Sequence, residues 1–325
     1  MMNPDITWPN PNAYLRMLVA ALPDDIEVVR FGWRAALAGR YDIFHAHWPE
    51  HMAGGRLTWL RVRLQVAFLL LIVANRIRRI PMVWTVHNIR PHEPADLSRR
   101  LGLRAWSAAV SRRIYLYAAA MPPGDAKGVV IRHGDYSPLY PPRDARPASP
   151  SGLLTFGLVR RYKGIEGLLS ALRRIPESQR PSAVIAGAPI DAAYVRELTA
   201  GGLAGARFDL RDLPDRELQS LIEDAAHVVL PYRRVYNSGA AILSLTLRRP
   251  ILVPESPTML ELAALVGGGW VRTYRGQLDP DDILSALGTR PTTAEPDLSA
   301  LQWPDLGRQH ADLYRGLVAR KPRLN

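Results

Sequence analysis

A short basic loop follows the first apolar run of the second half of the chain. Leu153–Leu158 predicts a strand, and the residues after it include Arg160, Arg161 and Lys163 before Gly164 opens a helical pattern. Two or three cations beside a helix N-terminus suit a diphosphate, which needs both countercharge and N–H donors. The alternative is an ordinary turn with solvated basic side chains, and spacing alone does not separate the two interpretations.

A second candidate anion site is the turn Asn237-Ser238-Gly239. Ser238 is a natural N-cap for the apolar helix that follows, and Gly239 leaves the N–H groups of its first turn open to a ligand. Arg233 stands just upstream. A capped helix without a ligand is the alternative. Both loops follow strands of one predicted domain, at their carboxyl ends, which favours a single shared anion.

Polar side chains in the first half could act on a hydroxyl group. His87 ends a predicted strand, and a histidine titrates near neutral pH, so it can serve as a base or as a hydrogen-bond partner. Glu50 and Glu93 end two polar clusters and could also accept a proton. We predict these three residues as catalytic, with further contacts from His47, Trp48 and Asn88; a packed structural histidine is the alternative for His87.

Two patterns could bind a metal ion. His45 and His47 would face the same way on a strand, and His51 follows them, which permits zinc. The adjacent Trp48-Pro49 turn, without a clear carboxylate to orient the rings, makes this the weaker interpretation. Asp279-Pro-Asp281 is better explained by helix capping, because acidic residues favour a helix N-terminus. We predict neither a metal nor a cofactor.

Apolar runs and helical patterns alternate along the chain, which is typical of parallel sheets with crossover helices. In the first half the predicted strands are Glu27–Phe31, Asp42–His45, Met82–His87 and Gly128–Arg132, and the predicted helices are Ala13–Leu22, Gly55–Arg79 and Ser98–Ala118. In the second half the predicted strands are Leu153–Leu158, Ala183–Ala186, Arg207–Leu210, His227–Leu230 and Ile251–Val253, and the predicted helices are Gly164–Arg174, Ala192–Leu198, Asp215–Asp224 and Gly239–Leu247.

A chain of 325 residues is expected to form two domains. Five prolines in Ser137–Pro150 exclude regular helix or central strand there and mark a linker. We therefore predict one domain over 1–140, a linker over 141–150 and a second domain over 151–304. A final helix, about Asp305–Val318, could cross back so that 305–325 completes the first domain.

The net charge of +12 comes almost entirely from arginine, since only three of the 42 basic residues are lysine. This charge implies a polyanionic partner, and the lack of a recognisable nucleic-acid-binding module argues against nucleic acid. The absence of cysteine excludes disulfides, zinc-thiolate sites and a cysteine nucleophile. Met1–Leu22 lacks the pattern of a secretory signal, so we expect a cytoplasmic protein.

The most apolar segment is the predicted helix over Leu57–Ile80. Its centre, Val66–Ala74, is nine apolar residues long, well short of the roughly 20 that span a membrane. One interpretation is a buried helix between the sheet and solvent. The other is peripheral contact between the Arg56–Arg79 region and an anionic membrane surface, and the two are compatible.

The motifs also resemble a known superfamily. Gly157-Leu-Val-Arg160 with Tyr162-Lys163-Gly164 is similar to the donor-phosphate segment of GT-B glycosyltransferases, and His227–Tyr232, Asn237–Gly239 and Arg249–Val253 resemble a later stretch of the same proteins. Phe44–Glu50 and Trp84–Glu93 resemble segments of a group of bacterial glycosyltransferases that make exopolysaccharides. That group includes β-mannosyltransferases acting on polyprenyl-diphosphate-linked sugars. The resemblance covers about Asp42 to Val271.

The resemblance implies an α/β fold of two Rossmann-like domains facing a cleft, and transfer of a sugar from a nucleotide diphosphate without a metal. GDP-mannose is the expected donor, bound by the second domain, and a lipid-linked glycan is the expected acceptor. The implied diphosphate contacts are Arg160, Lys163, Asn237, Ser238 and Gly239. The implied sugar contacts are Gly157, Tyr162, Arg233 and Tyr236, and the expected nucleobase loop contains Phe208, Leu210 and Leu213.

The sequence departs from the superfamily in one respect that bears on chemistry. Many retaining members carry two glutamates eight positions apart, and the corresponding places here fall near Val235 and Leu243. The usual sugar and ribose contacts therefore do not carry over, which favours inversion of the anomeric centre. Three other activities stay open: a transferase for a soluble acceptor, an epimerase or phosphorylase, and a non-catalytic module that binds anionic membranes or polymers.

Overall fold

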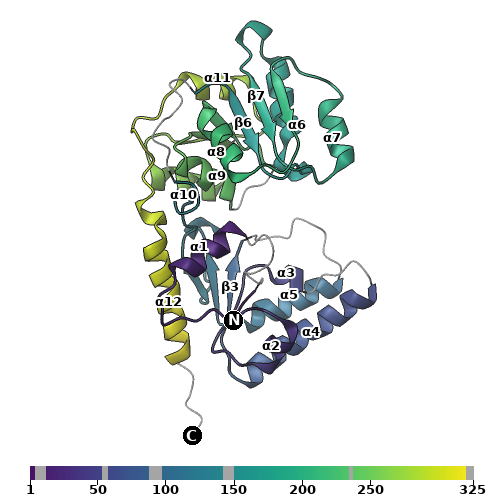
Figure 1. Cartoon of the computed structure of the whole chain (residues 1–325), viewed down its shortest axis with the longest axis vertical. Coiled ribbons are helices and arrows are strands. Elements are labelled where there is room, and N and C mark those ends of the chain that lie inside the picture. Colours follow the sequence, from purple (N-terminus) through teal and green to yellow (C-terminus); the bar gives the residue numbers. More distant parts are fainter. Residues whose placement is uncertain (4–11, 53–57, 88–96, 142–149, 234–236, 320–325) are drawn as a thin grey trace. The chain divides into compact units, whose positions relative to one another are not determined.

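The computed structural model describes residues 1–3, 12–52, 58–87, 97–141, 150–233 and 237–319. The chain divides into two compact units (Figure 1). Unit 1 comprises Met1–Gly134 and Leu301–Asn325, and unit 2 comprises Asp135–Ala300. The predicted fold class, two α/β domains with parallel sheets, is confirmed by the sheets of the two units.

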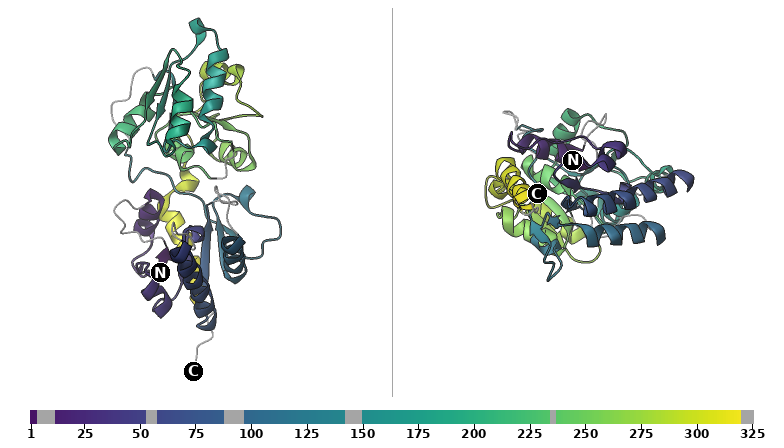
Figure 2. Two further views of the ribbon diagram at one scale, coloured as in Figure 1. Left: turned by 90° about the vertical axis from the view of Figure 1, so that its right-hand side faces the viewer. Right: turned by 90° about the horizontal axis from the view of Figure 1, so that it is seen from below.

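Unit 1 is built on a five-stranded parallel sheet in the order β1-β2-β3-β4-β5. Its strands are β1 (Met2–Asn3), β2 (Phe44–Ala46), β3 (Met82–Val86), β4 (Arg112–Tyr115) and β5 (Gly128–Val130). Its helices are α1 (Ala13–Ala21), α2 (Trp33–Ala38), α3 (Pro49–Met52), α4 (Thr58–Ile77), α5 (Leu97–Ala109) and α12 (Trp303–Ala319). The last helix lies beside α1, so the carboxyl-terminal segment packs within unit 1 (Figures 1 and 2).

Unit 2 is built on a six-stranded parallel sheet in the order β11-β10-β9-β6-β7-β8. Its strands are β6 (Leu153–Phe156), β7 (Ala183–Ala186), β8 (Ala206–Asp209), β9 (His227–Val229), β10 (Ile251–Pro254) and β11 (Val271–Tyr274). Its helices are α6 (Ile165–Arg174), α7 (Ala192–Thr199), α8 (Asp215–Asp224), α9 (Gly239–Thr246), α10 (Pro257–Val266) and α11 (Pro280–Gly288). The central strands β6 and β9 are buried along their whole length, as expected of a parallel sheet covered on both faces.

Two predictions for the first half were wrong. The helix predicted over Ser98–Ala118 ends at Ala109, and Arg112–Tyr115 forms β4, where Ile114 is fully buried between neighbouring strands. The two arginines that open β4 hid this strand in the sequence. Glu27–Phe31 is not a strand of the sheet either, because only Arg30 makes an isolated bridge, to Met2. Among the described residues, β1 comprises Met2 and Asn3.

The helix α10 and the strand β11 were not predicted. Ser256 caps α10 by accepting from the N–H of Met259, and Pro257 occupies the first turn. The strand β11 pairs with β10 and forms one edge of the sheet. Asp279 is the N-cap of α11 in a capping box with Asp282, as the capping interpretation of Asp279-Pro-Asp281 expects.

Candidate functional site

The basic loop of unit 2 folds back over the end of β6. Gly157 has φ +89° and Gly164 has φ +65°, conformations that favour glycine. Between them Lys163 is buried, and its Nζ donates to the carbonyl oxygen of Phe156 at 2.7 Å. The ammonium also lies 5.6 Å from the centre of the Tyr232 ring. Lys163 therefore has an internal partner at the carboxyl end of the strand.

The structure brings the two predicted anion loops together. The N–H of Arg233 donates to the carbonyl oxygen of Tyr162 at 2.9 Å. A Cβ on Gly164 would lie 2.1 Å from the carbonyl oxygen of Pro231, so a glycine is required for this approach. The adjacency that the sequence predicted only from strand order is thus a direct backbone contact.

The cations of these loops differ in what they already bind. Arg161 forms an ion pair with Glu197 at 2.7 Å, and Arg233 forms one with Glu166 at 2.7 Å. The guanidinium of Arg160 has no ion pair or hydrogen bond to the described residues, and its Nε is buried without a partner. Of the described basic side chains in the two loops, Arg160 is therefore the one available for an anion.

The N-terminus of α9 completes the anion-binding geometry of unit 2. Ser238 is buried and accepts from the N–H of Ala241 at 3.1 Å, as an N-cap does. Asn237 precedes it and is partly buried. A Cβ on Gly239 would lie 2.6 Å from the hydroxyl oxygen of Tyr136, so this hydroxyl packs directly against the first turn of the helix.

Tyr136 is a candidate that the sequence reasoning missed. Burial raises its pKa to about 12, so the phenol stays protonated at neutral pH and can donate to an anion. No pattern in the sequence marks this residue, since it lies about a hundred positions before the helix that it contacts and belongs to neither motif. Only tertiary packing identifies it.

The predicted nucleobase loop lies on the other side of β7. Phe208 lies in β8, and the partly buried side chains of Phe208 and Leu210 pack against a cluster that includes Ile185 and Tyr194. Leu213 is also partly buried. Three further predicted site residues, Asn88, Glu93 and Tyr236, lie outside the described residues.

In unit 1, two histidines meet at the carboxyl ends of β2 and β3. Nδ1 of His47 lies 3.1 Å from Nε2 of His87. The indole of Trp48 stacks on the His87 ring at 4.4 Å, and the Tyr14 ring meets it edge-on at 5.1 Å. Burial lowers the pKa of His87 to about 3, with a smaller contribution from His133, so the ring is neutral.

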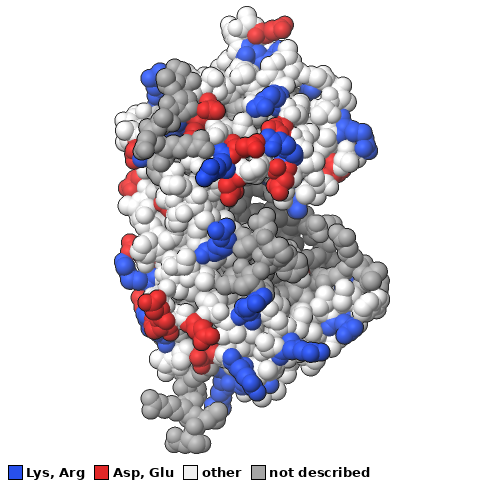
Figure 3. Space-filling view, viewed as in Figure 1, with Lys and Arg blue, Asp and Glu red and all other residues white. Residues whose placement is uncertain are grey.

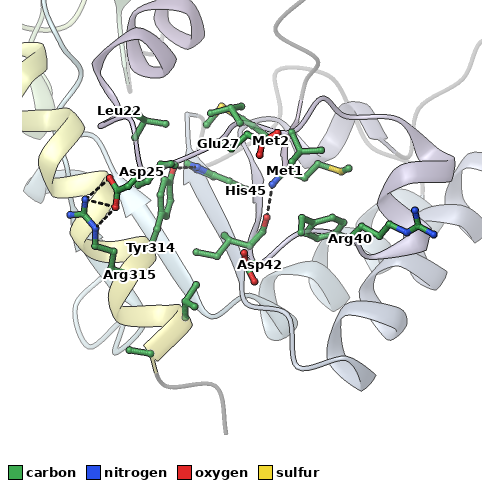
Figure 4. Close-up of a pocket in the computed structure, with 17 residues that line it drawn as sticks. Met1, Met2, Leu22, Asp25, Glu27, Arg40, Asp42, His45, Tyr314 and Arg315 are labelled. Carbon is green, nitrogen blue, oxygen red and sulfur yellow. Dashed lines mark hydrogen bonds and ion pairs between the residues drawn. The ribbon is translucent and has the colours of Figure 1, made fainter. Parts of the chain in front are cut away.

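A third histidine, His45, packs against this pair. His45 is buried, with Nε2 2.8 Å from the Thr85 hydroxyl and Nδ1 2.7 Å from the Tyr314 hydroxyl (Figure 4). Its ring lies 4.3 Å from that of His47. Because both nitrogens of His45 are hydrogen-bonded, its ring is a fixed surface against which His47 packs.

The zinc interpretation finds no support in the geometry. His51 lies exposed on α3, whereas His45 and His47 are buried. Within the described ranges, no group of three or more histidine, aspartate or glutamate side chains could hold a metal ion. Glu50 lies in the first turn of α3 and is partly buried.

A separate cavity of about 670 Å³ lies at the amino ends of the strands of unit 1 (Figure 4). It is lined by the segment before β2, by β1 and by the end of α12, where Arg315 pairs with Asp25 at 2.8 Å. His45 reaches its wall. Since His47 and His87 follow the carboxyl ends of β2 and β3, this cavity is not part of the candidate site.

The outer face of α4 carries an exposed apolar stripe. The helix buries Phe68, Leu71 and Ile72 against the core, as expected of a helix that lies between the sheet and solvent. The opposite face exposes residues spaced three or four apart, which we call the α4 stripe: Trp59, Val62, Val66, Leu69, Leu70, Val73 and Ile77. Each of these side chains is at least 45% exposed.

Positive charge surrounds the stripe. Neither α4 nor α5 contains an acidic residue, and Figure 3 shows Lys and Arg side chains without acidic ones over these helices. Arg63 packs its guanidinium over the Trp59 ring at 5.6 Å. No helix among the described residues is long and apolar enough to cross a membrane.

Comparison with known proteins agrees with the resemblance of the motifs. No family model matches the chain. The GDP-mannose:glycolipid 4-beta-D-mannosyltransferase of Xanthomonas campestris pv. campestris is 33% identical over 310 residues, which cover 94% of this chain and 88% of that protein. This similarity extends through both units.

Solved structures show the same fold at lower identity. Anabaena HepE in complex with UDP and glucose has a TM-score of 0.64 and 17% identity, over 87% of this chain and 80% of that one. AviGT4, a glycosyltransferase involved in avilamycin A biosynthesis, has a TM-score of 0.61 and 16% identity, over 94% and 89%. The chain therefore belongs to the glycosyltransferase family of the Xanthomonas mannosyltransferase and has the GT-B fold.

Proposed function

We propose that this glycosyltransferase moves mannose from GDP-mannose to a hydroxyl group of a lipid-linked glycan, in the biosynthesis of a polysaccharide. The observation that carries the proposal is the 33% identity, along 94% of the chain, to a relative whose name specifies this donor and a glycolipid acceptor. The site geometry of each unit supports one half of the reaction.

Unit 2 would bind the donor. When the bond to the sugar breaks, negative charge develops on the departing diphosphate and must be stabilised. The guanidinium of Arg160, which has no partner among the described residues, supplies positive charge, and the N-terminus of α9 supplies N–H donors beside the neutral hydroxyl of Tyr136. These groups would allow the reaction to proceed without a metal ion.

Unit 1 would bind the acceptor. The buried His47 and the partly buried His87 form a polar pair at the carboxyl ends of the strands, where ligands of open parallel sheets bind. Glu50, which lies in α3 next to Trp48, is a carboxylate that could take the proton of the attacking hydroxyl.

We also propose inversion at the sugar. GDP-mannose carries its sugar in the α configuration, so a β product requires attack from the opposite face. Neither of the two positions at which many retaining relatives carry glutamates, near Val235 and Leu243, is acidic in this chain.

The α4 stripe supports a location on the inner face of the cell membrane. A helix with one apolar face and basic flanks lies in the membrane interface, with arginines near anionic headgroups. A lipid-linked acceptor is held in that plane, so contact through the Arg56–Arg79 region would bring unit 1 to its substrate.

A transfer assay tests the proposal. The full-length protein is incubated with GDP-mannose, in the presence of EDTA, and with an oligosaccharide linked to polyprenyl diphosphate. We expect release of GDP together with a β-linked mannose, identified by NMR of the product. Transfer to a soluble acceptor but not to the lipid-linked one would contradict the lipid-linked acceptor and show that the protein is a transferase for a soluble acceptor. Release of free mannose without any acceptor dependence would contradict transfer.

Two variants locate the donor site in the same assay. We expect Arg160→Ala to lose at least about tenfold in kcat/KM, because a charge-assisted contact to the diphosphate disappears. Arg161→Ala removes the same charge from the same loop, but this guanidinium already pairs with Glu197. It should retain most of the activity, and equal losses in both variants would contradict the assignment of Arg160.

A further inference from the structure

One hydrogen bond joins the rings of His47 and His87. Nδ1 of His47 and Nε2 of His87 are 3.1 Å apart, and a neutral histidine has one donor nitrogen and one acceptor nitrogen. Both rings are neutral, because burial and the neighbouring histidines keep the pKa of each well below its usual value. One of the two facing nitrogens therefore carries a proton and donates the hydrogen bond, and the other nitrogen accepts that bond.

The second ring nitrogen of His47 decides which of them is the donor. Nε2 of His47 is buried and has no hydrogen-bond partner among the described residues. An N–H buried without a partner is the rarer arrangement in proteins, so the proton of His47 belongs on Nδ1. His47 then donates to His87, and Nε2 of His87 accepts.

The neighbouring rings oppose rotation out of this arrangement. His45, which is hydrogen-bonded at both nitrogens, packs 4.3 Å from the His47 ring. Trp48 stacks on His87 with only 18° between the ring planes, and Tyr14 stands nearly perpendicular to it at 88°. Turning either ring would break the hydrogen bond and disturb this packing at once.

We propose that His47 is a positioning residue that holds His87 in the tautomer with its proton on Nδ1. Nε2 of His87 accepts from His47, so this nitrogen does not act as the base that takes the proton of the acceptor hydroxyl. The role of His87 towards a sugar rests on the proposed transferase function, whereas the tautomer of His87 does not depend on that function. The proton of the acceptor hydroxyl must then pass to another group.

Two amide variants separate hydrogen bonding from packing. An asparagine in place of His47 puts an N–H close to the position of Nδ1, whereas a glutamine puts it farther out, towards the position of Nε2. His47→Asn should preserve the bond to His87, and His47→Gln should lose it. Both variants remove the imidazole and leave a neutral polar side chain, so a difference between them is not a general effect of losing the ring.

The first measurement is the ¹⁵N–¹H correlation spectrum of the histidine rings in the labelled full-length protein, with His87 assigned through the His87→Gln variant. We expect His87 protonated on Nδ1 in the wild type and in His47→Asn, and a rise of the Nε2-protonated form in His47→Gln. A wild-type His87 protonated on Nε2 would overturn the proposal, as would a tautomer that His47→Gln leaves unchanged.

The second measurement is transfer from GDP-mannose to a polyprenyl-diphosphate-linked oligosaccharide. We expect kcat/KM to fall about tenfold in His47→Gln, the equivalent of one hydrogen bond, and to stay within about threefold of the wild type in His47→Asn. Equal losses in the two variants would overturn the positioning role. No transfer by the wild type would refute the proposed function and the role of His87 towards a sugar, while the spectra would still decide the tautomer.

Discussion

The N–H of Arg233 donates to the carbonyl oxygen of Tyr162 at 2.9 Å, which joins the two loops of unit 2 through their backbones. These loops are about 70 residues apart in the sequence and carry the basic residue and the helix N-terminus assigned to the diphosphate. Because the contact is between backbone groups, it requires the two chain segments to approach closely. The residue that permits it is Gly164.

Gly164→Ala should therefore separate the loops. The new methyl group would lie 2.1 Å from the Pro231 carbonyl oxygen at a φ of +65°, and we expect a loss of about 2–4 kcal/mol in the free energy of unfolding. The control is Gly167→Ala in α6, where nothing lies within 4 Å and alanine should stabilise by about 1 kcal/mol. Chemical denaturation gives the unfolding free energy of each variant. Similar values for Gly164→Ala and Gly167→Ala would refute the close contact at Gly164.

Ser238→Ala should reduce both stability and nucleotide affinity. Loss of the cap on α9 costs about 1 kcal/mol and loosens the N–H groups assigned to the diphosphate. Ser256→Ala removes an equivalent cap from α10, where Ser256 accepts from Met259 at 3.2 Å. We expect similar unfolding free energies for the two variants but weaker GDP binding only for Ser238→Ala. If both bind GDP equally, the N-terminus of α9 is not part of the donor site.

Lys163 predicts a pH dependence of stability. Burial, and to a lesser extent repulsion by Arg160, lowers its pKa to about 8 from a usual 10.5. Between these values the unfolded chain binds more protons than the folded one, so raising the pH stabilises the fold. The unfolding free energy of the wild type should rise from pH 8 to pH 10 relative to that of Lys163→Met. A constant difference between the two proteins would show that Lys163 is not buried as an ammonium.

The α4 stripe predicts membrane binding that depends on its apolar residues. The double variant Val66→Glu, Leu70→Glu places two charges where both side chains are half exposed, so the fold should persist. We expect at least about a tenfold loss of binding to vesicles containing phosphatidylglycerol, measured by sedimentation. Ile190→Glu, at a similarly exposed apolar residue of unit 2, is the control. Vesicle binding that survives the double variant would exclude the stripe as the contact surface.

Sequence patterns predicted the strands and helices whose buried positions can be recognised from a few neighbouring residues. Ala183–Ala186 and Asp215–Asp224 were predicted with the bounds that the structure shows, because a mostly buried strand and a strongly amphipathic helix are each visible in a few residues. The strand β4 was missed because Arg113 is neutralised by Asp125 at 2.7 Å, a partner outside the strand. Such a tertiary ion pair has no signature in a short window.

In the candidate site, too, the sequence indicated features that depend on neighbouring residues but not those that depend on tertiary contacts. Motifs pointed to Arg160 and Ser238 as candidates, since loop cations and helix caps are read directly from neighbours in the chain. They could not show that Arg161 is already paired with Glu197, nor that Tyr136 packs against Gly239. For α4, apolar residues occur on both faces, so the sequence could not tell which face would be exposed.

Calorimetric titration with GDP, UDP and ADP tests the central claim, a nucleotide-sugar donor site in unit 2, most directly. The account predicts micromolar binding of GDP, weaker binding of UDP and ADP, and a loss of about tenfold or more in Arg160→Ala but not in Arg161→Ala. Tighter binding of UDP or ADP would contradict GDP-mannose as the donor. Absence of binding by all three to the folded protein would contradict the donor site itself.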